Sequence, residues 1–157
     1  MKITLLAVGR TADKLYAEGI RDYIERAGHY MPCEMEVIPE LKNTRNLSRE
    51  QQKQKEGEMI LKAIQPGDAV ALLDERGKEF RSAEFAGWIE KKSHTVSRRL
   101  VFVVGGPYGF SDAVYQAAHE RISLSKMTFS HQMVRLIFAE QLYRAMTILH
   151  NGPYHHE

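Results

Sequence analysis

The sequence predicts an α/β fold in which a mainly parallel sheet is flanked by helices. Segments with the two-residue period of strands alternate along the chain with segments of helical period. Residues 69–74 and 100–106 begin as continuous apolar runs, which are typical of strands covered by helices on both faces. No internal repeat or low-complexity linker interrupts this order. We therefore predict one domain over residues 1–157.

Five segments are predicted as strands. They are residues 2–9, 33–40, 69–74, 100–106 and 121–125. The polar residues "ERGK" at 75–78 are expected to turn the chain after the third strand.

Five helices are expected between and after these strands. The first covers residues 12–27, and the second runs from the cap Ser48 to about Ile64, with Gln51 completing a capping box. Ser82 is expected to cap a third helix that ends near Lys92, and Ser111 a fourth. The fifth runs from about His131 to His150 and leads into the tail "NGPYHHE".

The last helix is apolar around nearly its whole circumference, whereas a surface helix has one apolar stripe. The apolar positions are Met133, Val134, Leu136, Ile137, Phe138, Leu142, Tyr143, Met146, Ile148 and Leu149. Such a helix needs a second burial partner, and in a small domain we expect a second copy of the chain. A charged residue, for example Leu142→Arg, should then separate the homodimer.

Composition narrows the class of protein. The chain has 157 residues, 43% of them hydrophobic, and a net charge of +2, which permits an RNA partner without requiring one. The single cysteine, Cys33, excludes a disulfide framework and a multi-cysteine metal site, and it lies in an apolar strand where a core role is expected. No apolar run is long enough for a membrane span, so we expect a cytoplasmic protein.

A glycine loop follows the fourth strand, in "VVGGPYGF" at 103–110. A dinucleotide fold carries G-x-G-x-x-G after its first strand, where this chain has only Gly9, and Pro107 removes an amide that a phosphate cradle would use. A turn that needs glycine for its backbone angles is an equally good interpretation. Ligands of open α/β sheets bind beyond the carboxyl ends of strands, which keeps a binding role open.

Two further segments have a functional and a plain interpretation. The loop "ISLSKMTFSHQ" at 122–132 offers amides and hydroxyls to a polar ligand, or is a helix entry capped by Ser130. The C-terminal part is rich in histidine and arginine, which suits RNA phosphates or a solvated helix end. Its spacing supports no zinc site, and we predict no metal.

Taken together, these motifs resemble the ribosomal RNA large subunit methyltransferase H family of SPOUT methyltransferases. The similar segments are "MKITLLAVGR", "KEGE", "LLDERGK", "FVVGGPYGF", "ISLSKMTFSHQMVR", "AEQLYRA" and "PYHHE", which span the whole chain. The resemblance implies a trefoil-knotted fold and a homodimer. It also implies methyl transfer from S-adenosylmethionine to N3 of a pseudouridine in 23S rRNA of the assembled ribosome, with no DNA or membrane partner.

The resemblance also implies where the cofactor binds. The matching positions are Leu73, Gly105, Leu124, Ser125, Lys126, Met127, Thr128 and Phe129. Gly105 and Gly106 are then expected where the backbone passes close to the cofactor, because a side chain there would take up its space. Ser130 replaces a proline found in many relatives, and "LDERGK" is more charged than usual.

N3 of pseudouridine must lose a proton before it can attack the methyl group. Arg144 is expected to orient the base or stabilise its charge, or alternatively to brace the dimer. Tyr154 and His155 are expected to close over the nucleotide, and His131 to act from the helix start. Two rival functions remain at this stage: a non-catalytic RNA-binding protein and an enzyme that uses a nicotinamide or flavin.

Overall fold

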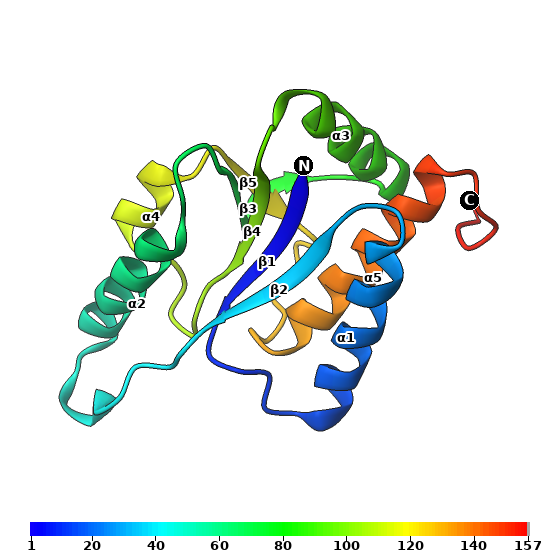
Figure 1. The fold of residues 1–157 in the computed structure, drawn as a ribbon. Helices are drawn as coiled ribbons and strands as arrows, with labels where there is room; N and C mark the ends of the chain where they lie inside the picture. The colour runs from blue at the N-terminus through cyan, green and yellow to red at the C-terminus, as the bar shows by residue number, and fades with distance from the viewer. Residues whose placement is uncertain (157) are drawn as a thin grey trace.

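The computed structural model describes residues 1–156; Glu157, the last residue of the expected tail, lies outside the described residues. Five parallel strands form one sheet in the order β2-β1-β4-β3-β5 (Figure 1). The strands are β1 (Lys2–Val8), β2 (Cys33–Ile38), β3 (Ala69–Glu79), β4 (Arg99–Val104) and β5 (Glu120–Ser123). The predicted α/β class is confirmed, and the sheet of these residues is entirely parallel.

Helices cover both faces of the sheet. They are α1 (Lys14–Gly28), α2 (Arg49–Ala63), α3 (Ser82–Thr95), α4 (Asp112–Ala117) and α5 (Met133–Leu149), with a short 3-10 turn η1 (Thr44–Asn46) before α2. Figure 1 shows α2 and α4 on one face and α1, α3 and α5 on the other.

Strand residues feed two apolar layers alternately. Ile3, Leu5 and Ala7 of β1 pack toward α1, α3 and α5, whereas Leu6 and Val8 pack toward α2 and α4. The residues of β4 alternate in the same way, and all six are buried. This two-sided burial is the reason that the central strands are continuously apolar.

The caps of α2 and α4 follow the expectations, and the cap of α3 is a correction. Ser48 and Gln51 form the predicted capping box, and the Ser111 hydroxyl accepts from the amide of Val114 at 3.3 Å. Ser82 is the first residue of α3 rather than its cap, because its hydroxyl donates to Gln141 of α5 at 2.9 Å. Arg81 is the cap residue.

The last helix begins two residues later than predicted. Gln132 is the N-cap residue of α5, in place of the predicted Ser130, but the Ser130 hydroxyl still accepts from the amide of Met133 at 3.0 Å. The Gln132 side chain accepts from the amide of Ala12 at 2.8 Å, which ties this entry to the segment after β1.

The predicted turn at residues 75–78 is wrong. β3 continues to Glu79, and both Leu73 and Lys78 lie opposite Ile122 of β5. Gly77 makes this possible: a Cβ atom there would lie 2.6 Å from the carbonyl carbon of Arg121 and from the nitrogen of Ile122. The strand bulges over residues 74–77 and returns against the backbone of β5, where only glycine fits.

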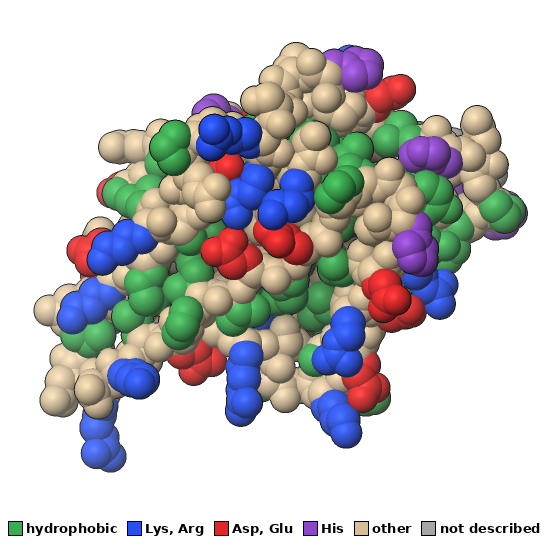
Figure 2. All heavy atoms as spheres, viewed as in Figure 1, with side chains coloured by type: hydrophobic (Ala, Val, Ile, Leu, Met, Phe, Trp, Pro, Cys, Tyr) green, Lys and Arg blue, Asp and Glu red, His purple; other side chains and the backbone are tan. Residues whose placement is uncertain are grey.

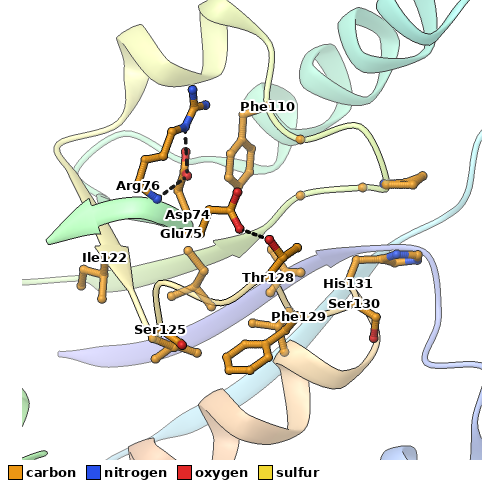
Figure 3. A pocket seen from close by; sticks show the side chains of 18 of the residues that line it. Asp74, Glu75, Arg76, Phe110, Ile122, Ser125, Thr128, Phe129, Ser130 and His131 are labelled. Atoms are coloured by element: carbon orange, nitrogen blue, oxygen red, sulfur yellow. Dashed lines mark hydrogen bonds and ion pairs between the residues drawn. The ribbon is translucent and has the colours of Figure 1, made fainter. Parts of the chain in front are cut away.

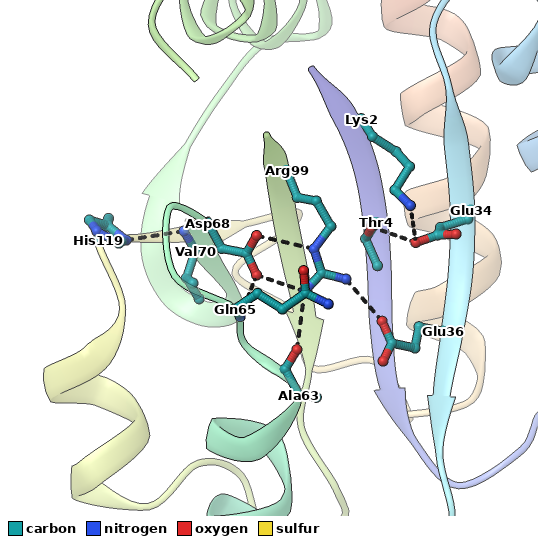
Figure 4. Close-up of polar contacts among 10 residues, drawn as sticks. All are labelled: Lys2, Thr4, Glu34, Glu36, Ala63, Gln65, Asp68, Val70, Arg99 and His119. Carbon is teal, nitrogen blue, oxygen red and sulfur yellow. Dashed lines mark hydrogen bonds and ion pairs between the residues drawn. The ribbon is translucent and has the colours of Figure 1, made fainter. Parts of the chain in front are cut away.

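A charged network holds the amino-terminal end of the sheet (Figure 4). Arg99 is buried, and its guanidinium lies 2.6 Å from Asp68 and 3.0 Å from Glu36. It also donates to the carbonyl oxygen of Ala63 at 3.1 Å. The network joins β2, β4 and the end of α2.

The apolar side chains around α5 fall into a buried set and a half-buried set. Phe138, Leu142 and Ala145 are fully buried in the core of their own chain, whereas Met133 and Ile137 are only half-buried. Leu142→Arg would therefore disrupt the fold and is unsuitable for separating a dimer, which corrects the sequence-based choice. Cys33 packs against the same core, and burial raises the pKa of its thiol to about 12, as suits a core residue.

Candidate functional site

A cavity of about 540 Å³ lies at the carboxyl ends of β3, β4 and β5 (Figure 3). Three chain segments surround it: the bulge of β3, the glycine loop after β4, and the loop after β5. Open α/β sheets bind ligands beyond the carboxyl ends of their strands, so this is the place where the fold favours a site. The volume falls within the range of about 300–1,000 Å³ that small-molecule sites occupy.

Most of the residues predicted to bind a cofactor meet at this cavity. Those that line it are Leu73, Gly105, Leu124, Ser125, Met127, Thr128 and Phe129. Lys126 is outside this lining: its side chain is 85% exposed, and Nζ lies 3.9 Å from the Glu79 carboxylate. The structure therefore brings seven of the eight positions together.

The loop after β5 is braced by its own polar side chains. The Ser123 hydroxyl donates to the carbonyl oxygen of Ser125 at 2.7 Å, and the Ser125 hydroxyl accepts from the amide of Met127 at 3.0 Å. The Thr128 hydroxyl donates to Glu75 of the β3 bulge, and Figure 3 shows the two side chains pointing toward one another. These bonds hold the loop across the cavity and connect it to β3.

Sequence reasoning missed a polar group on the wall of the cavity. Asp74 accepts from the Tyr115 hydroxyl at 2.5 Å, and Arg76 donates to the same hydroxyl at 3.0 Å. Burial and the bond to Asp74 raise the pKa of Tyr115. Burial of Asp74 acts to raise its pKa, but the bonds from Tyr115 and the Arg76 amide hold that pKa below its usual value. The charged "DER" directly after an apolar strand was the signal available in the sequence.

Gly106 of the glycine loop lines the cavity and also packs closely against α2. A Cβ atom at Gly106 would lie 2.5 Å from Oε2 and 2.6 Å from Oε1 of Glu56 on α2. Close packing against Glu56 is thus one reason for glycine at position 106, and room for a cofactor at Gly105 and Gly106 stays a prediction. Glu56 is only 4% exposed, its Oε1 has no hydrogen-bond partner among the described residues, and burial raises its pKa.

His131 lines the cavity at the entry to α5. Burial lowers its pKa, and the positive charge of Arg135 adds to this effect. Arg135 is fully buried one turn further on and donates to the carbonyl oxygens of Gly9 at 2.7 Å and Val8 at 3.0 Å. A neutral His131 offers a free ring nitrogen to a ligand in the cavity.

The other predicted catalytic residues gather elsewhere, at the far end of α5. The Arg144 guanidinium lies 2.6 Å from Glu140 and 4.7 Å from the centre of the Tyr154 ring, and its Nη1 lies 3.1 Å from His155 Nδ1. The Tyr154 hydroxyl donates to Glu140 at 3.0 Å, and burial raises its pKa, so it stays protonated. His131 lies just before α5, and Arg144 lies eleven residues after the first residue of the helix, Met133, a rise of about 16 Å along its axis. A single chain therefore divides the predicted catalytic residues between two places.

The cavity fits an S-adenosylmethionine molecule in size and in chemistry. Apolar side chains from all three segments line it, which suits an adenine ring and a methylthio group, and the braced loop after β5 supplies backbone polar groups. Within residues 1–156, no group of three or more His, Cys, Asp or Glu side chains is placed to hold a metal ion. No helix in the same range is long and apolar enough to cross a membrane.

The fold and this cavity define an α/β enzyme class that binds an organic cofactor where the strands end. The family described as "Predicted SPOUT methyltransferase" matches residues 1–155. The chain is 72% identical to the ribosomal RNA large subunit methyltransferase H of Phocaeicola vulgatus and 68% identical to that of Bacteroides fragilis, each over 100% of both chains. It is 57% identical to the protein of the same name from Porphyromonas gingivalis, again over both full lengths.

The chain therefore belongs to the ribosomal RNA large subunit methyltransferase H family of SPOUT methyltransferases. This family implies the knotted form of the α/β fold, as the sequence motifs indicated. Membership also decides against an enzyme that uses a nicotinamide or flavin.

Proposed function

We propose that this protein transfers a methyl group from S-adenosylmethionine to N3 of a pseudouridine in 23S rRNA, on the assembled ribosome in the cytoplasm. The observation that carries the proposal is the cavity where three loops meet, in a chain 72% identical to a ribosomal RNA large subunit methyltransferase. The substrate position and the cellular setting rest on the family resemblance.

Leu73, Gly105 and the loop from Leu124 to Phe129 would hold the cofactor. When bound, S-adenosylmethionine supplies a methyl group already activated by its sulfonium. The protein then has to exclude water and to place the acceptor nitrogen in line with that group. The bonds within the loop and the Thr128–Glu75 contact support this task, because they keep the cavity wall in one shape.

N3 becomes a strong nucleophile only after its proton is removed. Among the candidate residues, His131 lines the cavity, and its lowered pKa keeps a ring nitrogen free at neutral pH. We assign it the role of receiving that proton.

Arg144, Tyr154 and His155 complete the site in a homodimer. Arg144 lies near the end of α5 and the other two lie in the tail beyond it, away from the cavity of their own chain. The half-buried face of α5 with Met133 and Ile137 suits a second copy. In the proposed dimer, the C-terminal group of one chain faces the cavity of the other. Arg144 there orients the uracil ring and stabilises the negative charge left on it.

Mass spectrometry of 23S rRNA from cells that lack the gene tests the reaction. We expect the loss of a single methyl group on a pseudouridine, restored by the wild-type gene. An unchanged rRNA modification pattern would contradict the proposed substrate.

Calorimetric titration with S-adenosylmethionine tests the rival function. We expect saturable binding, whereas no binding at about 1 mM would favour a non-catalytic RNA-binding protein.

A further inference from the structure

Tyr108 stands exposed at the tip of the glycine loop. Its side chain is 41% exposed, although it is a large aromatic residue. The loop that carries it is a tight turn in which the amide of Gly109 donates to the carbonyl oxygen of Gly106 at 3.1 Å, and Pro107 stiffens it further. A short rigid turn thus presents the ring to solvent at little entropic cost.

Arg49 lies beside this ring. Its guanidinium carbon is 5.5 Å from the ring centre, a distance at which a cation and an aromatic ring attract each other. Arg49 is the first residue of α2, whose start is held by the capping box of Ser48. The part of the chain that the structure describes brings no carboxylate within ion-pair distance of Arg49, so its positive charge remains available to an anionic partner.

The Tyr108–Arg49 pair adjoins the cavity through the turn that carries Tyr108. Gly106, Pro107 and Gly109, which flank Tyr108 in the turn, line the cavity itself. Lys42 and Arg45 are exposed in the segment just before α2. Figure 2 shows Lys and Arg side chains along the lower edge of the molecule, over this segment and the start of α2. A substrate entering the cavity would pass the exposed ring and these charges.

We propose that Tyr108 and Arg49 form a stacking platform for an unpaired base of the RNA next to the methylated nucleotide. Unpaired bases stack on aromatic rings and on guanidinium planes, and basic side chains nearby bind the phosphates between them. The combination of an exposed ring, an unneutralised cation and flanking Lys42 and Arg45 fits RNA better than an apolar protein surface. The proposal rests on the proposed function, because it takes the substrate to be RNA.

The test uses the full-length enzyme and ribosomes isolated from cells that lack the gene. Tyr108→Leu keeps an apolar side chain but removes the stacking face, and we expect it to raise the KM for ribosomes by about 5- to 100-fold with kcat little changed. Tyr108→Phe keeps the ring and should restore the KM to within about twofold of the wild type. Arg49→Gln should reduce the salt dependence of ribosome binding by about one phosphate contact.

The control is Tyr30→Leu, which removes a tyrosine of nearly equal exposure, 40%, at the amino-terminal edge of the sheet. It should leave the KM for ribosomes unchanged. The melting temperature and the Kd for S-adenosylmethionine, measured for every variant, exclude loss of folding.

An unchanged KM for Tyr108→Leu would overturn the proposal. So would a cross-link of Tyr108 to a ribosomal protein in place of a nucleotide, after irradiation of the complex and peptide mass spectrometry. If the wild-type enzyme transfers no methyl group to ribosomes, the proposed function fails, and ribosome binding by Tyr108→Leu and Tyr108→Phe in a sedimentation assay still tests the platform.

Discussion

The guanidinium of Arg135 donates to the carbonyl oxygen of Gly9 at 2.7 Å across 126 residues of sequence. It also donates to the carbonyl oxygen of Val8 and to that of His131. One buried cation thereby joins the end of β1 to the entry of α5, where it bonds to the backbone of His131. Removal of the side chain would take from each of these backbone oxygens the donor that Arg135 supplies.

Arg135→Met should therefore destabilise the fold by about 3 kcal/mol, because several bonds to a charged group are lost in the interior. Urea denaturation measures this loss. Arg26→Met is the control, since Arg26 pairs with Asp22 on an exposed helix surface, where water screens the pair, and its loss should be much smaller. Equal losses for the two variants would contradict the bracing role of Arg135.

Gly77→Ala should disrupt the cavity. The new methyl group would lie 2.6 Å from the backbone of β5, so the strand or the bulge must move. We expect a lower melting temperature and at least tenfold weaker binding of S-adenosylmethionine, about 1.4 kcal/mol or more. Gly87→Ala in α3 has open space around its new Cβ and should stabilise the fold by about 0.5–1 kcal/mol. Unchanged cofactor binding in Gly77→Ala would show that the bulge does not shape the site.

Glu56 should make the fold less stable as the pH rises. Burial raises its pKa in the folded protein above that in the unfolded chain. The neutral acid therefore favours folding below the unfolded pKa, and this contribution is lost as the pH rises through the folded pKa.

Glu56→Gln should accordingly be more stable than the wild type at pH 8, by about 1 kcal/mol or more, and the difference should vanish in acid. Denaturation of both proteins over a pH series measures it. A constant difference at all pH values would mean that ionisation of Glu56 has no part in it.

Ile137→Asp should separate the proposed dimer. Ile137 is half-buried on α5 and, among the described residues, belongs to neither of the two apolar layers that cover the sheet. A charge there should therefore leave the fold of the chain intact. We expect a monomer in analytical ultracentrifugation that binds S-adenosylmethionine and has lost methyl transfer. Val37→Asp, on the exposed edge strand β2, is the control and should remain dimeric. A fully active monomer would contradict a site shared between chains.

Arg144→Ala should bind S-adenosylmethionine within about twofold of the wild type yet lose at least about 100-fold in kcat, because the charge on the uracil ring is no longer stabilised. Single-turnover methyl transfer to ribosomes measures this. Arg98→Ala removes an exposed arginine just before β4, outside the group formed by Arg144, Tyr154 and His155, and should have full activity. Turnover by Arg144→Ala at the wild-type rate, in a variant that remains dimeric, would contradict the proposed role.

Much of the fold was predictable from local pattern. The apolar runs at 69–74 and 100–104 became central strands, because burial on both faces removes the need for polar positions. The capping box of Ser48 and Gln51 was predictable for a different reason: its hydrogen bonds form between residues within one turn of helix. The extension of β3 to Glu79 was not, because the partner that stabilises it, β5, lies more than forty residues further along the chain.

The sequence by itself determined the α/β class and the family, and seven of the eight positions that it predicts to bind a cofactor line the cavity. Tertiary structure alone decided that Gly77 passes over the β5 backbone, that Gly106 packs on the buried Glu56, and that Leu142 lies in the core of its own chain. It also placed His131 at the cavity and Arg144 at the other end of α5. The physical reason is range: strand periods and helix caps depend on neighbours within a few residues, whereas close approach and burial depend on segments that only folding brings together.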